Sequence, residues 1–292
     1  MLDILNIILP VFVVIFIGYA FGKMTKMDIS PVVDIALYVG VPALVLTTVL
    51  DKEIVLLDAG KVWAAALIIT FGCGIVAWVV FRILHQKHSG LYLSISIMNT
   101  VNIPFPIIYF TYGSQGLLAA TLLFIASFMV MLSLGIYIVA GKQWREGIKE
   151  VFRIPLIYAF VIGLLLNLSN VTLHELVIKP LNLLGMMAIP LVLLVLGHNL
   201  SKVRINSLPT TLLASFLRMG VGLLFGILCV NLLNITGIFR SVVIFESVMP
   251  SAVMASVLTA KYNNEAELVA SVVFTTTVLS LVIIPFLLYI LV

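Results

Sequence analysis

The sequence predicts an all-α membrane protein with ten transmembrane helices, and three observations support this fold class. Of the 292 residues, 63% are hydrophobic and only 10% are charged, whereas soluble domains average about 45–50% apolar and about 25% charged residues. The hydrophobic residues form runs near the length that crosses a bilayer, which is about 20 residues. Two of these runs are broken by prolines at matching places in the two halves of the chain.

Ten apolar runs follow one another with short polar turns between them. The halves 1–140 and 155–292 are expected to hold five spans each, and the polar segment 141–154 is expected to be a cytoplasmic linker. The expected spans are 4–22, 31–50, 62–84, 91–112, 117–140, 155–168, 180–200, 208–233, 238–260 and 268–292.

The two halves resemble each other in sequence. Pro42 and Pro190 lie in similar apolar stretches of the second and seventh spans, and Tyr112 and Tyr262 follow the interrupted spans at a separation of 150 residues. Because each half holds an odd number of spans, the second half must enter the membrane from the opposite side. The expected architecture is therefore two inverted five-helix repeats, an arrangement found in many transporters.

The distribution of positive charge predicts the orientation. Of the 16 lysines and arginines, eleven lie at or after the ends of odd-numbered spans, and four lie on the opposite side. Lysine and arginine are enriched in cytoplasmic loops, so we expect a multi-pass protein of the cell membrane with both termini outside the cytoplasm. The net charge of +4 is small, and no nucleic-acid partner is expected from it.

The fourth span contains Asn99-Thr100-Val101-Asn102-Ile103-Pro104-Phe105-Pro106, which we call the first break. Each proline removes a backbone donor and clashes with the carbonyl one turn earlier. In a bilayer the freed carbonyls need partners, so such a break survives only where protein or a water-filled cavity surrounds it. The second break, Glu246-Ser247-Val248-Met249-Pro250-Ser251, lies in the matching span of the other half. Paired broken helices indicate the binding site of a secondary transporter.

The two breaks suggest a site for an organic anion. If each helix restarts near mid-membrane, its first N–H groups are unpaired and its N-terminus carries about half a positive charge. The amides of Asn99 and Asn102 and the hydroxyl of Ser251 would add donors, although the asparagines could instead only satisfy carbonyls freed by the prolines. The residues expected at the substrate site are Asn99, Asn102, Pro104, Pro106, Met249, Pro250 and Ser251.

Two charged residues inside spans suggest ion coupling. Glu246 is the only carboxylate that we place deep within a span, and an acid inside a membrane bundle marks a functional site by default. We expect it to carry a proton or, with Ser247, to coordinate sodium. Arg218, near the middle of the eighth span, is expected to be a counter-ion for the anion or for Glu246. The alternatives are structural. Glu246 could pair with Arg218 or simply face outward, and Arg218 could pair with carbonyls or snorkel towards the membrane interface.

Further residues around the breaks form a family pattern: Asn99-Thr100 before Pro106, then Tyr112-Gly113 and Gly116, and later Met249-Pro250 with Ala260-Lys261-Tyr262. In these motifs the chain resembles the auxin efflux carrier family, which includes plant auxin exporters and bacterial malate or malonate permeases. Its short polar segment 141–150 is similar to that of the bacterial members. Val101 and Pro104 stand where the family commonly has glycine, which leaves the shape of the cavity and the substrate open.

The resemblance implies a sodium/bile-acid-symporter-like (NhaA-like) fold. Spans 1, 2, 6 and 7 would form a scaffold, often dimeric. Spans 3–5 and 8–10 would form a moving transport domain, with spans 4 and 9 crossing at the site. The implied partners are a small carboxylate, the bilayer and a second copy of the chain.

The expected function is secondary active transport of small organic anions by elevator-type alternating access. Malate-like or malonate-like carboxylates are the first expected substrates, and auxin-like carboxylates are the next. Coupling to H⁺ or Na⁺ is expected through Glu246, with no other cofactor. An enzyme is not expected, because the sequence has no HExxH or G-x-S-x-G motif and no second intramembrane acid. The alternatives are a sodium/bile-acid-type symporter, and a non-transporting sensor or a channel on the same fold.

Overall fold

The computed structural model describes residues 2–25, 27–140 and 154–292, and all regular elements in these ranges are helices. Seven helical stretches among them are long and apolar enough to cross a membrane, and Pro155–Leu168 is a shorter apolar helix. The protein is therefore a multi-pass membrane protein. The expected linker 141–154 lies, except for its last residue, outside the described residues. The seven stretches are Ile4–Met24, Ser30–Asp51, Leu56–Ile83, Pro104–Ala140, Glu175–Ser201, Leu208–Leu232 and Ala266–Leu291.

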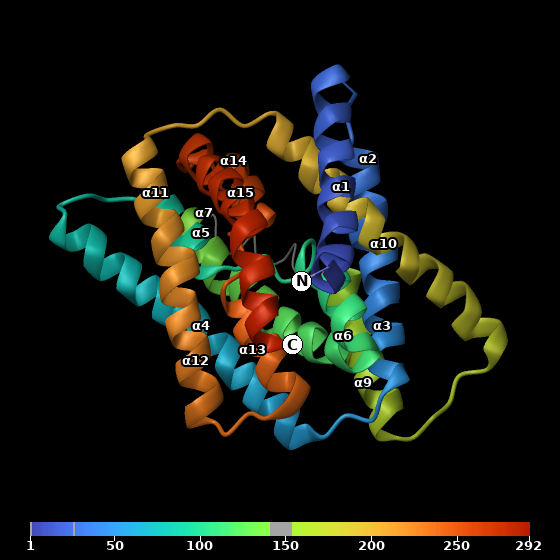
Figure 1. Cartoon of the computed structure of the whole chain (residues 1–292). Helices are drawn as coiled ribbons and strands as arrows, with labels where there is room; N and C mark the ends of the chain where they lie inside the picture. The colour runs from blue at the N-terminus through green and yellow to red at the C-terminus, as the bar shows by residue number, and fades with distance from the viewer. Residues whose placement is uncertain (1, 26, 141–153) are drawn as a thin grey trace.

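The helices follow the expected spans closely in both halves (Figure 1). The first half contains α1 (Leu2–Met24), α2 (Ser30–Ile35), the π-helical turn η1 (Ala36–Gly40), α3 (Val41–Asp51), α4 (Leu56–Ile83), α5 (Ser89–Ser96), α6 (Pro104–Val130), the π-helical turn η2 (Met131–Gly135) and α7 (Ile136–Ala140). The second half contains α9 (Pro155–Leu168), α10 (Glu175–Ser201), α11 (Leu208–Phe216), the π-helical turn η4 (Leu217–Val221), α12 (Gly222–Leu232), α13 (Gly237–Ser247), α14 (Val253–Lys261) and α15 (Ala266–Leu291).

Three of the ten predicted spans are not membrane-length helices: the sixth is the 14-residue helix Pro155–Leu168, and the fourth and ninth are divided by the breaks. The fourth predicted span is interrupted between Ser96 and Pro104, and the ninth between Ser247 and Val253, so their pieces are short. The fourth and fifth predicted spans meet at Gly113, where φ is 63° and ψ is −155°. Only glycine adopts this conformation without strain. The breaks are thus confirmed, whereas the count of ten and the inverted order stay predictions.

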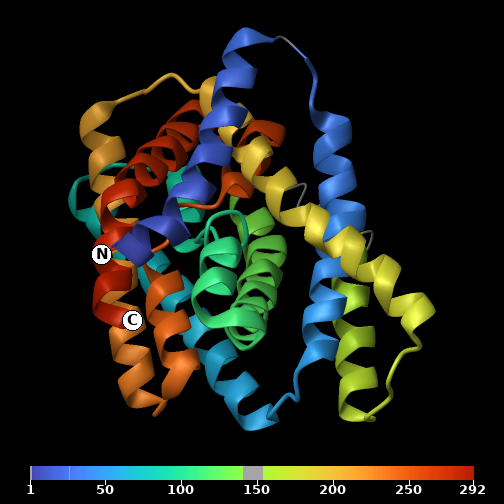
Figure 2. The ribbon, with the colours of Figure 1, turned by 45° about the vertical axis from the view of Figure 1, so that its right-hand side comes forward.

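One group of helices consists of α1, α2–α3, α9 and α10, on the right in Figure 1. In Figure 2, α2–α3, α9 and α10 lie on the right, and α1 runs from the top towards the N-terminus at the left. Within it α1 packs along α10, and α3 packs against α9 and α10. A Cβ atom on Gly197 would lie 1.9 Å from the Ile15 carbonyl oxygen, and one on Gly18 would lie 2.3 Å from the Leu194 carbonyl oxygen. Glycine therefore lets α1 and α10 approach backbone to backbone, as in many membrane interfaces.

A second group consists of α4–α7 and α11–α15, in which α6 packs on α4 and α13, and α12 packs on the same two helices. Both halves contribute a similar contact. A Cβ on Gly74 of α4 would lie 2.6 Å from the Ser96 hydroxyl at the end of α5. A Cβ on Gly226 of α12 would lie 2.2 Å from the Ser247 hydroxyl at the end of α13. Glycine on one helix thus receives the serine that ends each half-helix before its break.

Candidate functional site

The two breaks lie side by side and bond to each other through their backbones. The Asn99 N–H donates to the Pro250 carbonyl at 2.7 Å, and the Ala252 N–H donates to the Ile97 carbonyl at 3.0 Å. Met98 and Ser251 are paired between these bonds as an isolated antiparallel bridge. Polar backbone groups that each break leaves outside its helices therefore find partners in the other break, which is what a low-dielectric surrounding requires.

A pocket lies beside this crossing, between the two groups of helices. The volume within it that the centre of a water molecule can occupy is about 140 Å³. Its wall comes from α2, η1, α3, α9 and α10 on one side, and from the breaks, α6, η2 and α14 on the other. Most of the lining is aliphatic or aromatic, and no Asp, Glu, Lys or Arg belongs to the described lining. The polar members are Asn99, Thr100, Asn102, Ser127 and Asn199.

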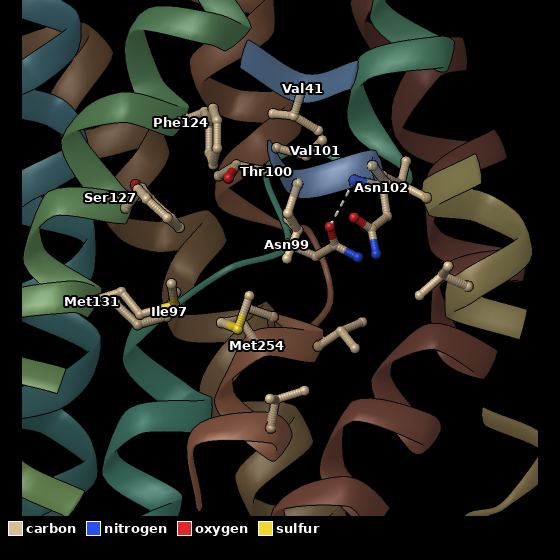
Figure 3. A pocket seen from close by; sticks show the side chains of 18 of the residues that line it. Val41, Ile97, Asn99, Thr100, Val101, Asn102, Phe124, Ser127, Met131 and Met254 are labelled. Carbon is tan, nitrogen blue, oxygen red and sulfur yellow. Dashed lines mark hydrogen bonds between the residues drawn. The ribbon is translucent and has the colours of Figure 1, made fainter. Parts of the chain in front are cut away.

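Asn99 uses the two ends of its carboxamide differently. Its Oδ1 accepts a hydrogen bond from the Asn102 backbone N–H at 3.0 Å (Figure 3). Its Nδ2 is buried and has no hydrogen-bond partner among the described residues. Figure 3 shows the Asn99 and Asn102 side chains together on one side of the pocket, opposite Phe124 and Ser127. Asn99 therefore supports the turn into α6 through a backbone N–H, not a freed carbonyl, and keeps an unpaired, buried donor in its Nδ2 group.

The two restarted helices offer unequal numbers of backbone donors. Val253 and Met254 begin α14 and line the pocket, and N–H groups of a first helical turn have no partner within the helix. At the start of α6, Pro104 and Pro106 have no N–H, and the Phe105 N–H donates to the Val101 carbonyl at 3.2 Å. The expected symmetry of two donor-rich helix ends is thus not what the structure shows. Backbone donors come from α14, and the side chain of Asn99 faces them from the first break.

Five residues expected at the substrate site lie behind the pocket wall. Pro104, Pro106, Met249, Pro250 and Ser251 are all buried, and none belongs to the lining. The Ser251 N–H donates to Thr276 Oγ1 at 3.1 Å, whereas its hydroxyl has no partner among the described residues. These residues shape the crossing from behind, and Asn99 and Asn102 are the expected residues that reach the pocket.

Glu246 is completely buried near the end of α13, and neither of its carboxylate oxygens has a hydrogen-bond partner among the described residues. It does not line the pocket. The next residue, Ser247, donates its hydroxyl to the Ile244 carbonyl at 2.7 Å. The ion pair between Glu246 and Arg218, which the sequence left open, is not formed.

Arg218 lies in η4 and is completely buried. Its Nη1 donates to the carbonyls of Ile95 at 2.8 Å and Ser96 at 3.0 Å, and its Nη2 donates to the Ser247 carbonyl at 2.8 Å. These carbonyls lie in the last turns of α5 and α13, directly before the two breaks. The guanidinium therefore contacts backbone and not a carboxylate, and it does not line the pocket.

Comparison with known proteins agrees with this arrangement. Residues 144–288 match the family described as membrane transport protein. The chain belongs to this family. An uncharacterized transporter of Methanocaldococcus jannaschii is 25% identical over 96% of this chain and 96% of its own length. An uncharacterized transporter of Methanothermobacter thermautotrophicus is 27% identical over 95% of each chain. The resemblance to auxin efflux carriers noted in the sequence is thereby confirmed.

Several residues of the transporter's pocket were not expected from the sequence. Phe124, Ser127, Phe128 and Met131 line it from α6 and η2. Their spacing of three to four residues places them on one helix face, which is the signal that the sequence did carry. Asn199 near the end of α10 had no comparable signal, because its position depends on how α10 packs against the other helices.

A second cavity continues the pocket of the transporter towards one end of the helices. The two share Asn199, Val253 and Val257 in their walls. Lys202 and Arg204, which follow α10, line the second cavity together with Glu267. In the expected orientation these basic residues lie on the cytoplasmic side, so the pocket would open to the cytoplasm.

Proposed function

We propose that this transporter is a secondary carrier of small organic anions that works by alternating access. The proposal is carried by the pocket at the crossing, where donors approach from Asn99 on one side and from Val253 and Met254 on the other. A helix N-terminus favours anions, and hydrogen bonds to a carboxylate are stronger than those between neutral groups. No acidic side chain in the described lining would repel the ligand.

The remaining lining favours a carboxylate with an apolar body. Phe124, Phe128, Met131 and Met254 face the space beside the donors. A second carboxylate, as in malate or malonate, would be buried there without a lysine or arginine in the described lining, and an unpaired buried charge is costly. We therefore place aromatic or branched monocarboxylates, which include auxin-like acids, ahead of malate-like dicarboxylates.

Glu246 is the coupling residue of the proposal. It is buried without a counter-charge, and a charged carboxylate in such a place is costly. This setting suits an acid that takes up a proton on one side of the membrane and releases it on the other. Sodium held by Glu246 and Ser247 is the second candidate.

The proposed motion is an elevator-type displacement of α4–α7 and α11–α15 against α1–α3, α9 and α10. The pocket lies between these groups. The packing of α1 on α10 has a counterpart in that of α9 on α3, as two inverted five-helix repeats would produce. The proposal includes ten spans, a location in the cell membrane, both termini outside the cytoplasm, and a homodimer formed by the first group, which rests on the family resemblance.

Counterflow in proteoliposomes tests this function. Vesicles loaded with unlabelled indoleacetate should transiently accumulate the labelled compound, and malate should compete at least about tenfold more weakly, which corresponds to about 1.4 kcal/mol. Unitary currents in planar bilayers would instead indicate a channel. Binding without flux would indicate a sensor. A folded protein that neither binds nor exchanges any carboxylate would contradict the anion site.

A further inference from the structure

We propose that Arg218 is a built-in cation that fills the place at the crossing where a free coupling cation would otherwise bind. The structural part of this inference stands on contacts within the protein. Its consequence for transport rests on the proposed carrier function.

The charge of Arg218 matches its surroundings. The C-terminus of a helix carries about half a negative charge, and both α5 and α13 end at the same guanidinium. Two such ends amount to about one negative charge, which one guanidinium offsets. The acceptors are backbone carbonyls before helix breaks, and transporters with broken helices use such carbonyls to coordinate sodium. The site thus has the character of a cation site, and the protein supplies its own cation.

The packing around Arg218 fixes the guanidinium in place. Its side chain has no exposed surface. A Cβ atom on Gly222 would lie 2.3 Å from Nη2 of Arg218 and 2.2 Å from the Ser247 carbonyl oxygen. The absence of a side chain at Gly222 therefore makes room for the hydrogen bond between the two. No ion pair of Arg218 with an acidic residue is present in the described part of the chain. Its positive charge therefore offsets the partial negative charges of the two helix ends.

A tethered cation has a direct consequence for coupling. A sodium ion at these carbonyls would need to displace the guanidinium and would be repelled by it. The crossing therefore needs no sodium in order to bring the two negative helix ends together. Transport should not depend on sodium, which leaves a proton on Glu246 or the anion gradient itself to drive it.

Thermal unfolding of the purified, substrate-free protein tests the cation site. We compare the wild type with Arg218→Ala in choline chloride, in sodium chloride, and in choline chloride containing low millimolar guanidinium. Arg218→Ala should lower the Tm by about 10 °C, because it leaves three buried carbonyls unpaired. Guanidinium should restore at least half of this loss and should not raise the Tm of the wild type. Arg240→Ala is the control, because Arg240 bonds the exposed Asn231 side chain, and guanidinium should not change its Tm.

Two results would overturn the inference: a Tm of Arg218→Ala equal to that of the wild type, or no response of the folded variant to guanidinium. If Arg218→Ala does not fold, substrate uptake by the wild type is measured in sodium and in choline buffer instead. Uptake that stops when choline replaces sodium would contradict a built-in cation, and equal uptake in both buffers would support it. Guanidinium rescue in a protein that binds no carboxylate would support the cation site and contradict the proposed function, so the two failures can be told apart.

Discussion

The two polar atoms of the Asn99 side chain have different roles. Oδ1 has a structural role, because it accepts a hydrogen bond from the Asn102 N–H, whereas Nδ2 has no partner among the described residues and is the atom proposed to bind the ligand. Asn99→Asp keeps the acceptor and the shape but replaces the donor by a negative charge. We expect the affinity for a carboxylate to fall about 10–100-fold, the loss of one hydrogen bond to a charged group. Titration calorimetry measures this change. Asn231→Asp, at an exposed position on α12, should leave the affinity unchanged, and an unchanged affinity for folded Asn99→Asp would remove Asn99 from the site.

Glu246 lies apart from the pocket lining, so its removal should separate coupling from binding. Glu246→Gln has nearly the same shape and cannot exchange a proton. We expect carboxylate counterflow to persist, whereas uptake driven by an imposed pH gradient should fall to the rate seen without a gradient. Both rates are measured in the same proteoliposomes. Glu175→Gln, at an exposed position paired with Lys179, is the control and should retain the acceleration of uptake by the pH gradient. If Glu246→Gln retains this acceleration as well, the coupling role of Glu246 is wrong.

At the scale of elements, the close contact between α1 and α10 predicts a strong dependence on residue size. In Gly197→Ala the new Cβ would lie 1.9 Å from the Ile15 carbonyl oxygen and 2.7 Å from the Tyr19 backbone nitrogen. Since backbone atoms cannot move aside like a flexible side chain, we expect a loss of at least about 1–3 kcal/mol, typical of overpacking. Thermal unfolding in detergent checks this.

The matched control for this contact is Gly60→Ala in α4, where an added Cβ meets nothing within 4 Å. Alanine is favoured over glycine inside a helix by about 0.5–1 kcal/mol, so the Tm should stay the same or rise. The two variants make the same chemical change with opposite expected signs. Equal effects of both would mean that α1 and α10 are not packed as the structure shows.

The sequence predicts the helices and their breaks better than it predicts the contacts between them. Proline excludes a continuous helix from local sterics alone, so the interruptions before Pro104 and around Pro250 follow directly from the sequence. The unequal donor supply of α6 and α14 was not predicted, because it depends on which N–H groups face the pocket. Arg218 pairs with the end of α5, more than 120 positions away in the sequence, and with the end of α13, 29 positions away. A lone arginine in a span does not identify such partners.

At the scale of the whole molecule, the pocket itself is a product of packing. Asn99 and Asn102 could be identified because they sit beside prolines, whereas Ser127, Asn199 and Met254 belong to separate helices that meet only in the folded protein. Their residue types are ordinary for membrane helices. The sequence therefore identified the part of the pocket formed by the first break, and the rest of the wall followed only from the packing of the helices.

The second cavity extends this wall to a basic entrance and yields a prediction about the rate of substrate entry. Lys202 and Arg204 are exposed and line it, and Glu267 is the acidic residue beside them. Charges along a cleft raise the local concentration of oppositely charged ligands. The double variant Lys202→Gln/Arg204→Gln should raise the KM for an anion about tenfold at low ionic strength, and Glu267→Gln should lower it. Initial uptake rates in vesicles of fixed orientation measure both values.

The dependence on salt separates steering by these charges from direct binding. Interactions between exposed charges are largely screened beyond about 8 Å at physiological ionic strength, so the difference in KM should shrink as salt is added. Lys87→Gln removes an exposed charge from the turn after α4, outside this cavity, and should not change the KM. An effect of Lys87→Gln as large as that of the double variant would show that net charge acts without a defined entrance. A difference that persists at high salt would instead mean that Lys202 or Arg204 contacts the substrate directly.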